Sequence, residues 1–139
     1  MIEHRRKTIL VIEDERPLVK VIETKLEKGG FDVVTARTVK QGLEYIDDIE
    51  SIDAVWLDHY LLGEETGLDF VSTMKNRGGL YKKMPIFVVS NTASSTNVSE
   101  YLRLGVTEYS VKSNHRLEEI TTNINKYIDN RREIDSTKI

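Results

Sequence analysis

The chain has 139 residues, the length of one ordinary domain, and a formal net charge of −3, which provides no basic surface for nucleic acid or for a membrane. It contains no cysteine, so disulfides and thiolate chemistry are excluded. Residues 1–8 carry no apolar signal segment, and the apolar runs are too short to cross a bilayer. We therefore expect a cytoplasmic protein whose partners are neither nucleic acids nor membranes.

Short apolar runs alternate along the chain with stretches that have the apolar spacing of helices. The runs are rich in Val and Ile, as are strands of a parallel sheet covered on both faces. In chain order, the predicted strands are Ile9–Ile12, Val33–Thr35, Ala54–Leu57, Ile86–Val89 and Tyr109–Val111. A predicted helix follows each strand, around Leu18–Leu26, Val39–Ile46, Leu68–Met74, Val98–Leu102 and Leu117–Ile128.

Capping residues mark the ends of these helices. Thr38 is a suitable N-cap for the second helix, and Gly78-Gly79 is expected to end the third. Residues 131–139 lose the helical period, which predicts a frayed tail after a domain spanning residues 7–130. We expect no output domain beyond it.

Five strands alternating with five helices predict an α/β fold of the doubly wound class. The common arrangement is a flavodoxin-like parallel sheet of five strands in the order 2-1-3-4-5, with helices on both faces. The first and third strands are then neighbours, and the direction of winding reverses between them. Ligands of such sheets bind at this point, beyond the carboxyl ends of the strands.

Polar residues stand at four predicted strand ends on this edge. Glu13 and Asp14 follow the first strand, Asp58 the third and Ser90 the fourth, while Lys112 ends the fifth. Each has an ordinary explanation alone: an acid caps or favours a helix start, a serine forms a turn, and a lysine is solvated. Their gathering at one edge is better explained by a functional site.

The residue types at this edge suit phosphoryl transfer. Clustered carboxylates repel one another unless a cation joins them, and oxygen ligands with room for water suit Mg²⁺. Lys112 and Ser90 can bind phosphate oxygens. The set predicts phosphorylation of Asp58 itself, with Mg²⁺ as cofactor.

Four segments carry a resemblance to a known family: "ILVIEDE", "AVWLDHYLLGEETGLDF", "IFVVSNTAS" and "TEYSVKS". From about Lys7 to Ile128, the chain resembles the CheY-like receiver domains of two-component response regulators. The resemblance implies that Asp58 accepts phosphate from a histidine kinase or a histidine phosphotransfer protein. It also implies a signalling role, in which the chain catalyses only its own phosphorylation and dephosphorylation.

The resemblance further implies roles for the surrounding residues. Glu13, Asp14, Asp58 and the backbone carbonyl of Tyr60 would hold Mg²⁺, and Lys112 would bridge to the phosphoryl group. Ser90 and Tyr109 would act as switch residues, although ordinary packing explains a strand tyrosine equally well. Phosphorylation would then reshape the face formed by the helix around Val98–Leu102, the strand Tyr109–Val111 and the helix Leu117–Ile128, which an unknown downstream protein would recognise.

The sequence departs from the commonest receiver pattern at three places. The "LLGEETG" loop is longer, Asn91 replaces a smaller residue, and Ser113 follows Lys112 where proline is usual. Because a cis peptide before a non-proline residue costs about 2.5–4 kcal/mol, we predict a trans bond between Lys112 and Ser113. His59 beside Asp58 raises the option of a general base or a phosphohistidine, whereas His4 and His115 are expected at the surface.

Three alternative functions remain open from the residues. An aspartyl-nucleophile phosphatase would carry a DxD motif after the first strand. Here Asp58 follows the third strand, and position 60 is Tyr. A flavin-binding module needs a phosphate-binding loop after the first strand, where "EDERP" would repel phosphate. A receiver-like interaction module without phosphotransfer would not need this set of polar residues.

Overall fold

The computed structural model describes residues 6–49, 51–91, 95–112 and 117–136, with side chains up to residue 129 apart from residue 95. Five parallel strands form one sheet in the order β2-β1-β3-β4-β5, which confirms the predicted fold class. The predictions for His4, His115 and the Lys112–Ser113 peptide bond lie outside the described residues.

The strands extend slightly beyond the apolar runs that predicted them. Ile12 of β1 lies opposite Leu57 of β3, so the residues that follow these two strands emerge side by side. The register therefore brings Glu13 next to Asp58. The strand bounds are β1 Thr8–Ile12, β2 Asp32–Ala36, β3 Ile52–Leu57, β4 Ile86–Ser90 and β5 Glu108–Val111.

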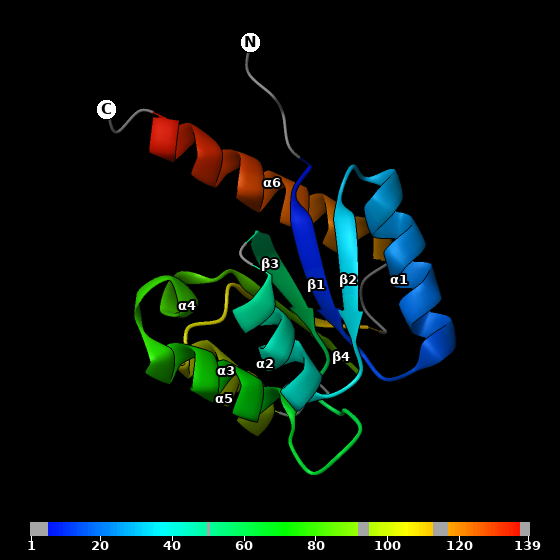
Figure 1. Ribbon diagram of the computed structural model, residues 1–139, viewed down its shortest axis with the longest axis vertical. Helices are drawn as coiled ribbons and strands as arrows, with labels where there is room; N and C mark the ends of the chain where they lie inside the picture. Colours follow the sequence, from blue (N-terminus) through cyan, green and yellow to red (C-terminus); the bar gives the residue numbers. More distant parts are fainter. Residues whose placement is uncertain (1–5, 50, 92–94, 113–116, 137–139) are drawn as a thin grey trace.

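Helices form a layer on each face of the sheet (Figure 1). Their bounds are α1 Arg16–Lys28, α2 Val39–Asp48, α3 Gly67–Arg77, α4 Gly79–Lys83, α5 Ser95–Arg103 and α6 Leu117–Ser136. Ile9 and Val11 of β1 pack with residues of α1 and α6, whereas Leu10 and Ile12 pack with residues of α2, α3 and α5. This alternation along a strand divides the core into two apolar clusters.

Two features differ from the sequence-based expectation. The short helix α4 was not predicted; it begins directly after Gly78, and the positive φ angles of Gly78 and Gly79 (69° and 56°) turn the chain out of α3 into it. Helix α6 continues to Ser136, beyond the end near Ile128 that the apolar spacing predicted. Backbone hydrogen bonding continues a helix even where the apolar stripe ends.

Among the described residues, no helix combines the length and the apolar character that spanning a bilayer requires.

The predicted cap of α2 is confirmed, because the Thr38 hydroxyl accepts the Gln41 N–H at 3.0 Å. We predict that Thr38→Ala lowers the free energy of unfolding by about 1 kcal/mol, since this N–H loses its partner. Urea denaturation measures the change. Thr122→Ala is the matched control: it removes an exposed hydroxyl within α6 and should change stability by less than about 0.5 kcal/mol. Equal effects of the two substitutions would contradict the assignment of the cap.

Candidate phosphoacceptor and metal site

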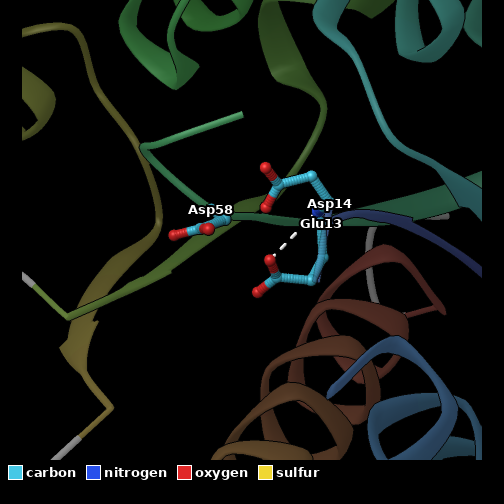
Figure 2. A group of neighbouring side chains, drawn as sticks. All are labelled: Glu13, Asp14 and Asp58. Atoms are coloured by element: carbon cyan, nitrogen blue, oxygen red, sulfur yellow. Dashed lines mark hydrogen bonds between the residues drawn. The ribbon is translucent and has the colours of Figure 1, made fainter. Parts of the chain in front are cut away.

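Three carboxylates meet at the carboxyl ends of β1 and β3, as the sequence predicted. Glu13, Asp14 and Asp58 each offer an oxygen, and these oxygens lie within 4.8 Å of one another. Figure 2 shows the three side chains beside one another where the two adjacent strands end. Glu13 and Asp58 are buried, which makes their mutual repulsion strong.

The Glu13 carboxylate binds partners with both of its oxygens. Oε1 accepts a hydrogen bond from Lys112 Nζ at 2.7 Å, and Oε2 accepts the N–H groups of Asp14 and Glu15 at 3.0 and 3.3 Å. The backbone contacts lie just before α1, where a negative charge also favours the start of a helix. Glu13 therefore links the Lys112 ammonium group, which follows β5, to the backbone just before α1.

Asp58 does not serve as the N-cap of the following helix. Its Oδ1 accepts the His59 N–H at 2.8 Å, and its Oδ2 lies 3.7 Å from Lys112 Nζ. Helix α3 is instead capped by Thr66 and Asp69, which exchange side-chain and backbone hydrogen bonds in a capping box. The capping explanation for Asp58 is thus excluded, and its buried carboxylate is left for another role.

The electrostatic environment of Asp58 favours the arrival of a cation. Burial raises the pKa of Asp58 to about 7, and the Glu13 carboxylate adds to the rise, while Lys112 and the His59 N–H oppose it. The buried carboxylates of Glu13 and Asp58 share Lys112, and the half-buried Asp14 adds a third carboxylate, so negative charge is in excess. Carboxylate oxygens with this excess of charge fit a hard divalent cation such as Mg²⁺.

Ser90, Lys112 and Tyr109 lie where the strand pattern predicted. Ser90 ends β4 with its side chain fully buried, and its carbonyl accepts the Lys112 N–H at 2.8 Å. Tyr109 pairs with Val88 across β4 and β5 and hydrogen bonds to the Ser90 side chain. Tyr60 follows His59 and exposes its side chain, and a metal-binding role for its carbonyl stays a prediction.

The sequence raised a general-base or phosphohistidine option for His59 and did not predict the contact that its ring makes with Tyr101. Its side chain is buried, and its Nδ1 lies 2.6 Å from the Tyr101 hydroxyl of α5. Burial lowers the pKa of His59 and raises that of Tyr101 above its usual range, which favours neutral forms of both. Only the helical spacing of Tyr101 with Val98 hinted that this tyrosine faces inward.

Arg37 is a second residue that the sequence did not single out. It follows β2, and its guanidinium donates a hydrogen bond to the Asp14 carbonyl at 3.2 Å. Its Nε is buried, with no hydrogen-bond partner in the part of the chain that the structure describes. Arg37 therefore fixes the backbone that carries Asp14 and adds positive charge beside the acidic cluster.

We predict that Asp58→Asn stabilises the fold at pH 8 without Mg²⁺, raising the thermal midpoint by about 2–6 °C. A carboxyl group whose pKa is raised on folding destabilises the folded state once it is ionised. Wild-type stability should therefore fall as the pH rises from about 4 to about 7, and the advantage of the variant should vanish near pH 4.

Thermal unfolding monitored by circular dichroism, with chelator present, checks this. Asp48→Asn removes an exposed carboxylate from the end of α2 and should leave the midpoint nearly unchanged at every pH. An advantage of Asp58→Asn that is independent of pH would contradict the electrostatic explanation.

Comparisons with known proteins agree with this geometry. A family model for the response regulator receiver domain matches residues 9–125. The chain is 32% identical over 134 residues to the hybrid signal transduction histidine kinase I of Dictyostelium discoideum, covering 89% of this chain and 8% of that protein. It is 28% identical over 101 residues to the transcriptional regulatory protein CpxR of Escherichia coli strain K12, covering 73% of this chain and 40% of that protein.

The fold has close counterparts among solved structures. The CheY-like response regulator receiver domain protein of Methanospirillum hungatei JF-1 superposes with a TM-score of 0.82 at 22% identity, covering 93% of this chain and 98% of that one. The chain spans less than half the length of the two longer relatives named above. The family model covers most of the chain, from β1 into α6, and the chain therefore belongs to the response regulator receiver domain family of two-component signalling.

Proposed function

We propose that this chain is a phosphoacceptor receiver, which takes a phosphoryl group onto Asp58 from a histidine kinase or a histidine phosphotransfer protein. The supporting observation is the buried cluster of Glu13, Asp14 and Asp58, with Lys112 Nζ 2.7 Å from Glu13 and 3.7 Å from Asp58. It joins a carboxylate nucleophile to a cation that can neutralise phosphate charge. The family's role as a signalling phosphoacceptor supports the same assignment.

In the proposed reaction, an Asp58 oxygen attacks the phosphorus of a phosphohistidine. The new bond joins oxygen to phosphorus while the bond from phosphorus to the imidazole nitrogen breaks. The nitrogen keeps the electron pair and takes a proton from solvent. Later attack of water on the phosphorus releases inorganic phosphate and restores the Asp58 carboxylate, so the switch resets.

Glu13, Asp14 and Asp58 would hold Mg²⁺, with the Tyr60 carbonyl as a further ligand. When bound, the ion supplies neutralisation of charge on the phosphoryl oxygens. Lys112 would exchange its contact with Glu13 for one with the phosphoryl group, because the two acceptors lie within reach of one flexible side chain.

Ser90 and Tyr109 would carry the signal outward. A donor hydroxyl on Ser90 would bind a phosphoryl oxygen, which would break its hydrogen bond with Tyr109. Tyr109 would then move, and the face formed by α5, β5 and α6 would change shape. A downstream protein in the cytoplasm would recognise this face.

We predict that acetyl phosphate with Mg²⁺ adds one phosphoryl group to the protein and that Asp58→Asn abolishes the addition. The reason is that the amide has no anionic oxygen to attack phosphorus. Intact mass spectrometry measures the labelling, and beryllofluoride should occupy the same position.

Asp48→Asn is the matched control and should label as the wild type does. Labelling of the Asp58→Asn variant at the wild-type rate would disprove the phosphoacceptor assignment. A wild-type protein that fails to label would favour an interaction module without phosphotransfer.

We further predict that Mg²⁺ binds before phosphorylation and changes the fluorescence of Trp56. Trp56 is fully buried in β3, two positions before Asp58. Asp14→Ala should weaken binding by at least about tenfold, because even the loss of an outer-shell partner has this effect. Fluorescence titration measures the affinity, and Asp48→Ala, which removes an exposed acid, should titrate as wild type. An unchanged titration of Asp14→Ala would show that Asp14 is not a ligand.

A further inference from the structure

His59, the residue after Asp58, forms a buried pair of polar side chains with Tyr101. His59 is 6% exposed and Tyr101 is fully buried, and the distance from Nδ1 of His59 to the Tyr101 hydroxyl is 2.6 Å. Burying polar groups is costly unless they bond to each other, and an aliphatic pair would fill this space at lower cost. The hydrogen bond therefore calls for an explanation other than packing.

The His59 backbone is held at two further points. Its N–H donates to Asp58 Oδ1 at 2.8 Å, and its carbonyl accepts the Gly67 N–H at 3.0 Å. A Cβ atom at Gly67 would lie 2.5 Å from the Tyr101 hydroxyl and 2.8 Å from the Asp58 carbonyl oxygen, so glycine is required by this close approach. The ring of His59 is thus held by Tyr101, its carbonyl by Gly67 and its N–H by the side chain of the preceding residue, Asp58.

Tyr101 extends this connection to the strand that carries Lys112. Its ring packs against that of Tyr109, with a centroid distance of 5.6 Å, and Tyr109 hydrogen bonds to Ser90. A continuous series of contacts therefore leads from Asp58 through His59 and Tyr101 to Tyr109. Helix α5 contributes the Tyr101 side chain to this series.

The orientation of the His59 ring argues against a direct chemical role. Nδ1 is engaged by Tyr101, and Nε2 lies 3.5 Å from the Asn97 side chain, also on α5. The ring edge also meets Tyr60, with a centroid distance of 4.6 Å. Both nitrogens thus face α5, whereas the backbone N–H faces the Asp58 carboxylate.

We propose that His59 and Tyr101 form a positioning pair, in which the hydrogen bond from α5 fixes the backbone N–H that orients the phosphoacceptor carboxylate. The proposal rests on the phosphoacceptor function of Asp58. It assigns to Tyr101 a role in the speed of phosphorylation and in the response of α5, although Tyr101 does not contact the carboxylate.

The test is a double-mutant cycle with Tyr101→Phe, His59→Leu and both together. Tyr101→Phe keeps the ring and removes only the hydroxyl. Two measurements are made: hydrogen exchange of the His59 backbone amide by NMR without Mg²⁺, and the rate of labelling by acetyl phosphate with Mg²⁺. Beryllofluoride then reports whether modification of Asp58 alters exchange in Ser95–Arg103.

For Tyr101→Phe we expect the His59 amide to exchange about 3–10 times faster and labelling to slow by a similar factor, the range that one hydrogen bond provides. In the His59→Leu background, Tyr101→Phe should change the labelling rate by less than about twofold, since their shared bond is already lost. The response of α5 to beryllofluoride should also shrink.

Tyr127→Phe is the matched control. Its ring packs edge-to-face on Phe87 in the opposite cluster, and both measurements should match the wild type. Unchanged amide exchange and labelling in Tyr101→Phe would overturn the pair, and so would faster exchange with an unchanged labelling rate, because the bond would then be structural only. Additive effects in the cycle would equally exclude a shared bond.

Failure of the phosphoacceptor assignment can be told apart from failure of the positioning pair. If the wild type does not label, the phosphoacceptor role is wrong and any effect of the pair on phosphorylation falls with it. The exchange of the His59 amide in the unmodified protein still decides whether Tyr101 holds that N–H in place.

Discussion

Repulsion among carboxylates at one edge of the sheet, opposed by the Lys112 ammonium group, is the constraint on which the rest of this structure depends. Lys112 lies at the end of β5, and its partner Glu13 lies at the end of β1, with β3 and β4 between them. The 2.7 Å contact therefore joins the ends of two strands that are not neighbours in the sheet. The same contact leaves negative charge in excess, so the fold presents three carboxylates whose oxygens lie close enough together to suit a divalent cation.

Strand-end residues were predictable because parallel strands place their carboxyl ends on one edge whatever the packing of the helices. The prediction of this site required only that the strand ends be placed to within about a residue. It then identified Glu13, Asp58, Ser90 and Lys112. The short helix α4 was missed because five residues, "GLYKK", are too few to show a helical period. The end of α6 was missed because the apolar spacing stops near Ile128 while backbone hydrogen bonds continue the helix.

His59 and Arg37 show a different limit of sequence reasoning. Adjacency to Asp58 suggested a chemical role for His59, yet its ring turns toward Tyr101, a residue distant in the chain. Arg37 contacts a carbonyl of Asp14 rather than a charged side chain, and no spacing rule identifies such a contact. Which side chain supports a site depends on how helices seat against the sheet, and apolar patterns specify the face of a helix but not its individual contacts.

The hydrogen bond between the Gly67 N–H and the His59 carbonyl closes the segment between them into a loop with fixed ends. Tyr60 and residues 62–65 are exposed, and lengthening a closed loop costs only about 0.6 kcal/mol for each doubling of its length. Insertions here therefore need not displace Asp58. Descendants of such a chain can vary residues 62–65 at the rim while Asp58 keeps its place, so the outer surface and the carboxylates beneath it are free to diverge at separate rates.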